Sequence, residues 1–291
     1  MITSSVDSVS PAIAKEWLKR NTGNFRKKDK SRVTRYAREM KTGNWHLNGE
    51  SIKFDENGIL IDGQHRLEAC VESGTDFQTV VVRNVPPESA QSVDRGKPRT
   101  VAQWLQHQGI KNGIDVASIA RNCVAHEKGL WATRAWGAGL ITDSEVIDFA
   151  NEHQHVITEC RNGSRLSGMP ISLLGTILFI GSGKRDPNTS ETAKWFREAL
   201  CNGIGLNSDD AVLHLRNRII KTHYTKSGED EGHGKVSPNS AKVSTWMLRW
   251  IATLAWNKTV KGEACGPMAL RIRLTGPTPT KPPSTILVAD Q

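Results

Sequence analysis

The chain has 291 residues, 24% of them charged, and lysine and arginine exceed aspartate and glutamate by 39 − 30 = 9. Five widely spaced cysteines, with no apolar segment of spanning length, exclude a disulfide scaffold, a cysteine zinc cluster and a membrane-spanning protein. We therefore expect a reduced, cytoplasmic protein with two domains, without a membrane partner.

The positive charge is concentrated near the start of the chain. Between Lys19 and Lys41 there are ten basic residues and two acidic ones, a net of 10 − 2 = +8. Ser10 and Pro11 predict the cap and first residue of a short helix that runs through Leu18.

A second helix is predicted from about residue 29 to residue 41, because its apolar residues recur at helical spacing. Basic residues lie on the opposite side of this helix. Such a face is either simply solvated or a surface that contacts nucleic-acid phosphates. The candidate nucleic-acid-binding residues are Lys28, Arg32, Arg35 and Arg38.

Residues 50–54 and 58–61 predict a β-hairpin across the turn Asp55-Glu56-Asn57-Gly58. Glu50 begins the first strand of this hairpin. Its carboxylate is a candidate general base or metal ligand, or a solvent-facing strand residue.

The hairpin leads into a polar run, Asp62-Gly63-Gln64-His65-Arg66, before Leu67 and Cys70 resume helical spacing. This pattern predicts a strand-to-helix turn, where the unpaired N–H groups of the first helical turn favour an anion. Arg66 adds donors that suit phosphate oxygens, Asp62 a ligand for Mg²⁺, and His65 a group that titrates near neutrality. The alternative is a surface turn with Asp62 as a cap.

The run Asp62 to Arg66, with the strand before it and the helix after it, resembles the phosphate-binding turn of the ParB/sulfiredoxin superfamily. The resemblance covers roughly residues 1–99. ParB partition proteins carry Gly-Glu-Arg-Arg at this point, and sulfiredoxins a catalytic cysteine where this chain has Gln64. The free-serine kinases of the superfamily read Asp-Gly-His-His-Arg, which differs from this chain only at Gln64.

The resemblance implies an α/β (α+β) nucleotide-binding domain that takes ATP or CTP with Mg²⁺. It assigns phosphate binding to Gly63, Gln64 and Arg66. Asp62 or Glu50 would hold the metal or activate a nucleophile, and His65 would support the transferring group.

Residues 78–85 predict a further strand, followed by a basic loop. This loop either closes over a phosphate or acts as a hinge. Its candidate ligand-binding residues are Arg95, Lys97 and Arg99.

From residue 100 onward the apolar spacing is helical, which predicts an all-helical domain over residues 100–274. The stripe that contains Trp246 and Trp250 is typical of a helix packed into a core. Residues 275–291 predict a disordered tail.

The sequence thus favours a nucleotide-binding protein that hydrolyses a nucleotide or transfers its terminal phosphoryl group, in a role linked to DNA. A non-catalytic DNA-binding adaptor or regulator is the alternative, and a ParB-like nuclease is a third reading. The nucleotide, the acceptor and the oligomeric state stay open.

Overall fold

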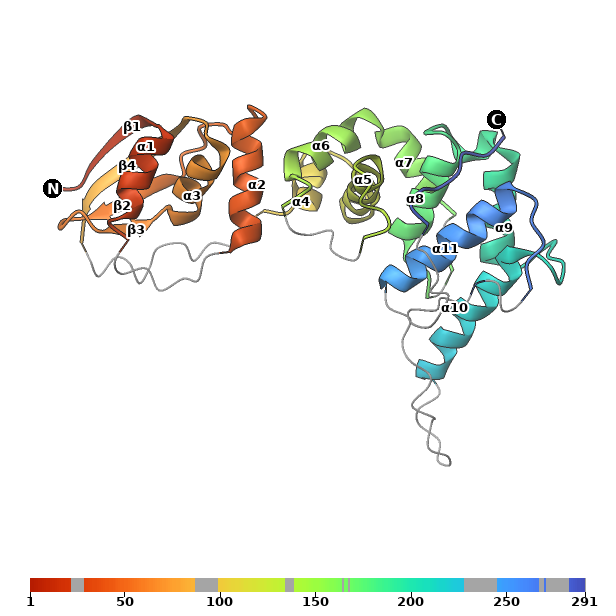
Figure 1. The fold of residues 1–291 in the computed structure, drawn as a ribbon. Coiled ribbons are helices and arrows are strands. Elements are labelled where there is room, and N and C mark those ends of the chain that lie inside the picture. Colours follow the sequence, from red (N-terminus) through yellow and green to blue (C-terminus); the bar gives the residue numbers. More distant parts are fainter. Residues whose placement is uncertain are drawn as a thin grey trace, which may run out of the picture. The chain divides into compact units, whose positions relative to one another are not determined.

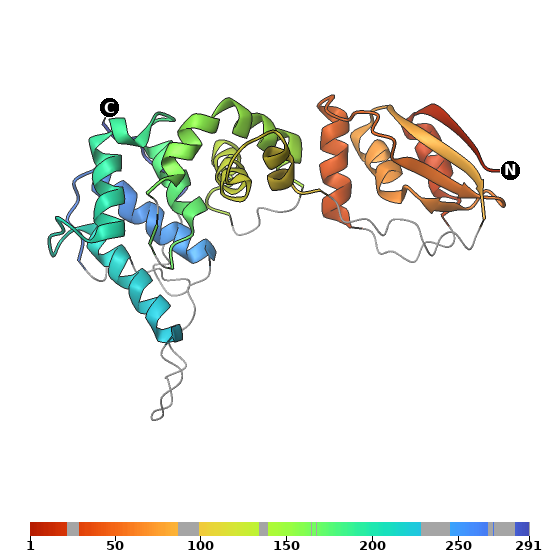
Figure 2. The same cartoon turned by 180° about the vertical axis from the view of Figure 1, so that it is seen from behind.

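The computed structural model describes residues 1–21, 29–86, 99–133, 139–163, 165–166, 168–227, 245–266, 270 and 283–290, with the backbone alone for residues 222–227. The chain divides into two compact units: Met1–Arg99 with Ala135–Glu145, and Thr100–Arg134 with Val146–Gln291. Residues 135–145 therefore group with the first unit, whereas the sequence placed them in the helical domain. Figures 1 and 2 show the elements of each unit from opposite sides.

The first unit contains a four-stranded sheet with the order β1-β4-β2-β3 among its described residues. The central strands β2 and β4 are parallel, and each outer strand pairs antiparallel with its neighbour. The predicted hairpin is confirmed as β2 and β3, and the predicted strand over residues 78–85 as β4. The strands are β1 (Thr3–Val9), β2 (Ser51–Asp55), β3 (Leu60–Asp62) and β4 (Phe77–Val85).

Three helices accompany this sheet: α1 (Pro11–Leu18), α2 (Lys30–Lys41) and α3 (Gln64–Ser73). The side chain of Ser10 accepts a hydrogen bond from the backbone of Ile13, which confirms the predicted cap of α1. Asp29 caps α2 in the same way.

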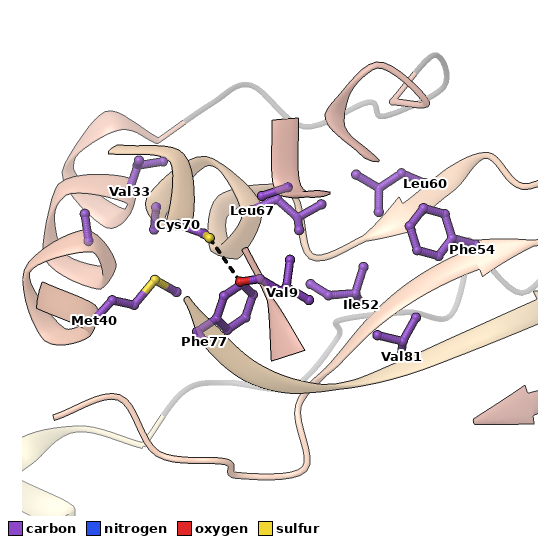
Figure 3. Packing of buried hydrophobic residues seen from close by; sticks show 13 residues of the cluster. Val9, Val33, Met40, Ile52, Phe54, Leu60, Leu67, Cys70, Phe77 and Val81 are labelled. Atoms are coloured by element: carbon purple, nitrogen blue, oxygen red, sulfur yellow. Dashed lines mark hydrogen bonds between the residues drawn. The ribbon is translucent and has the colours of Figure 1, made fainter. Parts of the chain in front are cut away.

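The core of the first unit lies where the apolar faces of the helices meet one face of the sheet (Figure 3). Cys70 is part of it, and its thiol donates to the carbonyl of Val9 over 3.4 Å. Burial raises the pKa of Cys70 to about 11, so this thiol stays protonated at neutral pH. Residues labelled in Figure 3 are Val9, Val33, Met40, Ile52, Phe54, Leu60, Leu67, Cys70, Phe77 and Val81.

The described part of the second unit contains helices and no strand, so the protein is mixed α and β. α6 begins in the segment that groups with the first unit and continues in the second. The helices are α4 (Val101–His107), α5 (Gly113–Glu127), α6 (Asp143–Glu152), α7 (Gln154–Arg161), α8 (Ile171–Gly181), α9 (Glu191–Asn202), α10 (Ala211–Ser227) and α11 (Thr245–Val260), with a 3₁₀ turn at Pro187–Thr189.

Apolar side chains of α8 and α11 form much of the core of the second unit. Trp250 of α11 is buried and Trp246 is partly buried, which confirms the predicted core role of this helix. Trp256, outside the predicted stripe, is buried as well. Among the described residues, no helix is both long and apolar enough to cross a membrane. All five cysteines carry free thiols.

The structure differs from the predicted disordered tail at residues 283–290. Trp256 donates from its indole nitrogen to the carbonyl of Leu287 over 2.7 Å, and the backbone N–H of Ala289 donates to Gly181 over 2.8 Å. Ile286 and Ala289 are buried. This segment therefore packs on the helical unit. Its spaced apolar residues are buried there, and composition alone does not reveal such contacts. Residues 275–282 of the predicted tail lie outside the described residues.

Candidate functional site

The predicted strand-to-helix turn is confirmed between β3 and α3. β3 ends at Asp62, Gly63 caps the helix with φ 101°, and α3 begins at Gln64. An oxygen of Asp62 accepts from the backbone N–H of Gly63 over 2.7 Å. The turn therefore leads into the N-terminus of α3, where partial positive charge favours an anion.

Gly63 is needed for packing as well as for its backbone conformation. A Cβ atom added there would lie 2.3 Å from Cδ1 of Ile52, a core residue of β2. The turn lies so close to the sheet that only glycine fits at this position, so the glycine is explained without invoking a bound ligand.

Arg66 joins the first turn of α3 to β2 and β3. Its guanidinium donates to the carbonyl of Ser51 over 2.8 Å and to the Glu50 carboxylate over 3.1 Å. A longer contact of 3.5 Å reaches Asp62. The structure therefore brings three of the predicted site residues, Glu50, Asp62 and Arg66, into one cluster of charges.

Lys53 also belongs to this cluster, although it was not among the candidate residues predicted from the sequence. Its ammonium lies 2.6 Å from the second carboxylate oxygen of Asp62. The signal was present in the sequence, because Lys53 alternates with the core residues Ile52 and Phe54 and is paired with Asp62 in the hairpin register.

His65 has a different partner. Its Nε2 atom accepts a hydrogen bond from the backbone N–H of Asp29 over 3.0 Å. An imidazole nitrogen that accepts a hydrogen bond carries no proton, so the hydrogen of neutral His65 is on Nδ1. His65 therefore holds the start of α2 against the first turn of α3, and its Nε2 is already occupied.

The predicted metal role fits these carboxylates poorly. One oxygen of Asp62 accepts from Gly63 and the other faces Lys53, so a cation would have to share these oxygens with the two donors or displace them. Glu50 is exposed but contributes one carboxylate. Across the described ranges, no three His, Cys, Asp or Glu side chains are placed to hold a metal ion. A Mg²⁺ ion at this turn would need most of its ligands from phosphates and water.

The candidate basic face of α2 is partly covered by residues 140–145. Arg38 donates to the Glu145 carboxylate and to the carbonyl of Leu140, each over 2.8 Å, and Arg35 lies 3.5 Å from Asp143. These two arginines therefore have acidic partners within the folded chain, while about a third of each side chain stays exposed. Acidic residues a hundred positions away neutralise them, a pairing that spacing within one helix cannot reveal.

The remaining predicted residues are not brought to the turn by any described contact. Arg32 is partly exposed on α2, and Arg99 is exposed. Lys28, Arg95 and Lys97 lie outside the described residues.

No protein-family model, curated protein or solved structure matches this chain.

Proposed function

We propose that the first unit binds a nucleotide, ATP or CTP, through its phosphates at the first turn of α3. The observation that carries the proposal is the pairing of a buried arginine with an exposed carboxylate at a helix N-terminus. Arg66 is 11% exposed and Glu50 is 67% exposed. The Glu50 carboxylate thus already places an anion beside Arg66, and Glu50 is the most weakly held side chain of the cluster.

A ligand phosphate can replace Glu50 at low cost. A largely exposed ion pair contributes roughly 0–1 kcal/mol. A charge-assisted hydrogen bond from a buried arginine to phosphate contributes about 1.5–3 kcal/mol. Exchange of the carboxylate for a phosphate is therefore favourable, while Ser51 and Asp62 keep Arg66 in place.

The likeness of residues 62–66 to the ParB/sulfiredoxin turn supports the same ligand class. The α+β fold of the first unit is compatible with that superfamily. Phosphoryl transfer or hydrolysis is the activity that the resemblance implies. Once a phosphate has displaced Glu50 from Arg66, Glu50 is the carboxylate best placed to assist phosphoryl transfer or hydrolysis. Both oxygens of Asp62 already accept hydrogen bonds, from Gly63 and from Lys53.

A second candidate is a nucleotide-binding regulator without turnover. It is favoured by the contacts of Asp62 and His65, which hold the turn and the start of α2 in place. A link to DNA would then rest on the excess of positive charge in the chain and on Arg32, since Arg35 and Arg38 have acidic partners.

The proposal is tested by thermal unfolding with ATP, CTP, GTP and tripolyphosphate, each with Mg²⁺ and with EDTA. A ligand at a hundred times its dissociation constant stabilises the folded protein by about 2.7 kcal/mol. Phosphate release measured in the same mixtures separates turnover from binding. If no ligand shifts the transition under any condition, the proposed function is wrong.

A further inference from the structure

Gln64 presents a buried acceptor that no group in the described part of the chain satisfies. The residue is 6% exposed, and its Oε1 atom is buried without a hydrogen-bond partner. A buried polar atom without a partner costs about 1–3 kcal/mol. Such a group in a folded protein needs an explanation, and a missing ligand is one.

Gln64 is the first residue of α3, so this residue lies in the same turn as the proposed phosphate site. The donors of the charge cluster at this turn are used elsewhere. Gly63 donates to Asp62, and the side chains of Lys53 and Arg66 have their own acceptors in Asp62, Glu50 and Ser51.

The unsatisfied atom is an acceptor, which restricts the ligand. Phosphate oxygens are themselves acceptors, so the anion bound by Arg66 and the helix N-terminus cannot satisfy Oε1. A sugar hydroxyl or an exocyclic amino group can. The complete ligand therefore carries both phosphate and a hydrogen-bond donor.

We infer that Gln64 accepts a hydrogen bond from the nucleoside part of the ligand, and that this turn selects nucleotides over inorganic polyphosphates. The inference rests on the proposed function and adds the group that is recognised. Its energetic consequence is twofold: Gln64 weakens the free protein and strengthens the complex.

The variant Gln64→Met separates these two effects, because methionine has a similar length and no acceptor to satisfy. We expect the free variant to unfold at the same temperature as the parent or at a higher one. If Gln64 served only the fold, its replacement by methionine would instead lower the unfolding temperature. Gln78→Met is the matched control, since Gln78 is exposed on β4.

Calorimetry with ATP and tripolyphosphate measures the second effect. We expect the parent to bind ATP about tenfold more tightly than tripolyphosphate, the ratio that one hydrogen bond of about 1.4 kcal/mol provides. Gln64→Met should reduce this ratio to near one by weakening ATP alone, and Gln78→Met should leave it unchanged. Dideoxy-ATP and ITP identify the donor, since the first lacks the sugar hydroxyls and the second the amino group.

The outcomes also distinguish the two proposals. If the parent binds ATP and tripolyphosphate equally, or if Gln64→Met weakens both alike, the turn binds phosphate but the role of Gln64 is overturned. If the parent binds neither, the proposed function fails and the inference with it. The comparison of ligands on the parent protein decides the matter even if the variant does not fold.

Discussion

The guanidinium of Arg66 is buried, while the Glu50 carboxylate that it contacts over 3.1 Å is largely exposed. The two partners are thus held very differently. Arg66 is fixed by Ser51 and Asp62 as well, whereas Glu50 lies before the first residue of β2 and its side chain faces solvent. Glu50 therefore behaves as an exchangeable anion, and Arg66 as a fixed part of the turn.

Replacing Glu50 with glutamine should strengthen anion binding. The substitution removes the negative charge that competes for Arg66, so we expect tripolyphosphate affinity in EDTA to rise about threefold to tenfold, on the order of 1 kcal/mol. Glu56→Gln, at the exposed hairpin turn, is the matched control. Calorimetry gives the affinities. Unchanged affinity in Glu50→Gln would mean that phosphate does not take the place of this carboxylate.

The same variant tests the metal role of Glu50. If Glu50 holds Mg²⁺ beside the nucleotide, Glu50→Gln should weaken ATP binding in Mg²⁺ while strengthening tripolyphosphate binding in EDTA. A rise in affinity under both conditions would mean that Glu50 only competes with the ligand phosphate for Arg66 and does not hold Mg²⁺.

Arg66→Ala should destabilise the first unit as well as weaken anion binding. It removes the donor to Ser51 and leaves Glu50 and Asp62 without their shared cation, so we expect a loss of about 2–4 kcal/mol in the free energy of unfolding. Arg83→Ala is the control, because Arg83 is 41% exposed and pairs with Asp7. Urea unfolding gives both values. Equal small losses in the two variants would contradict a structural role for Arg66.

Gly63→Ala tests whether packing accounts for this glycine. The new Cβ would meet Ile52 at 2.3 Å in a backbone conformation with φ 101°. We expect a cost of about 2–5 kcal/mol, from the left-handed backbone and from overpacking together. Adding Ile52→Val should recover part of this loss, since it removes the atom in contact. If the double variant is no more stable than Gly63→Ala, backbone conformation alone explains the cost.

The turn and its neighbours were predictable because their signals are local. Ser10, the hairpin across residues 55–58 and the change of spacing after Asp62 each report on a few consecutive residues. β1 was missed because it is rich in serine and mostly exposed, so its sequence has little strand pattern.

The partners within the site could not be predicted in the same way. The sequence identified Arg66 and Glu50 as candidate residues but did not show that the two side chains form an ion pair with each other. The two acidic partners of α2, Asp143 and Glu145, are more than a hundred residues away, and only the folded chain brings them together. Local pattern thus located the turn, while its charge balance is set by long-range contacts.

The contact between Arg38 and Glu145 gives a further prediction. Arg38→Gln should destabilise the first unit by about 1–2 kcal/mol, because Glu145 and the carbonyl of Leu140 lose a charged donor. Arg32→Gln should have little effect on stability. If this helix binds DNA, the order reverses in a gel-shift titration, and Arg32→Gln weakens binding more than Arg38→Gln. A larger effect of Arg38→Gln on DNA affinity would show that its acidic partners release it.

The last prediction concerns pH and the segment 283–290, which His126 helps to hold. Nε2 of His126 accepts from the backbone N–H of Ile286 over 3.1 Å, so this contact requires a neutral imidazole. Burial lowers the pKa of His126 below its ordinary value; Glu127 raises this pKa by a smaller amount, and Lys184 lowers it further. Between the lowered folded value and the unfolded value of about 6.5, the unfolded chain binds more protons than the folded one.

Stability should therefore fall as the pH drops through about 6.5, and the segment should loosen in the same range. His126→Gln keeps an acceptor that does not titrate, so we expect a flatter pH dependence of the unfolding temperature between pH 8 and 5. His107→Gln, at an exposed position of α4, is the matched control. Carboxypeptidase digestion gives an independent measurement: release of the C-terminal residues should accelerate at low pH in the parent and less in His126→Gln. Parallel curves for all three proteins would show that His126 does not control this segment.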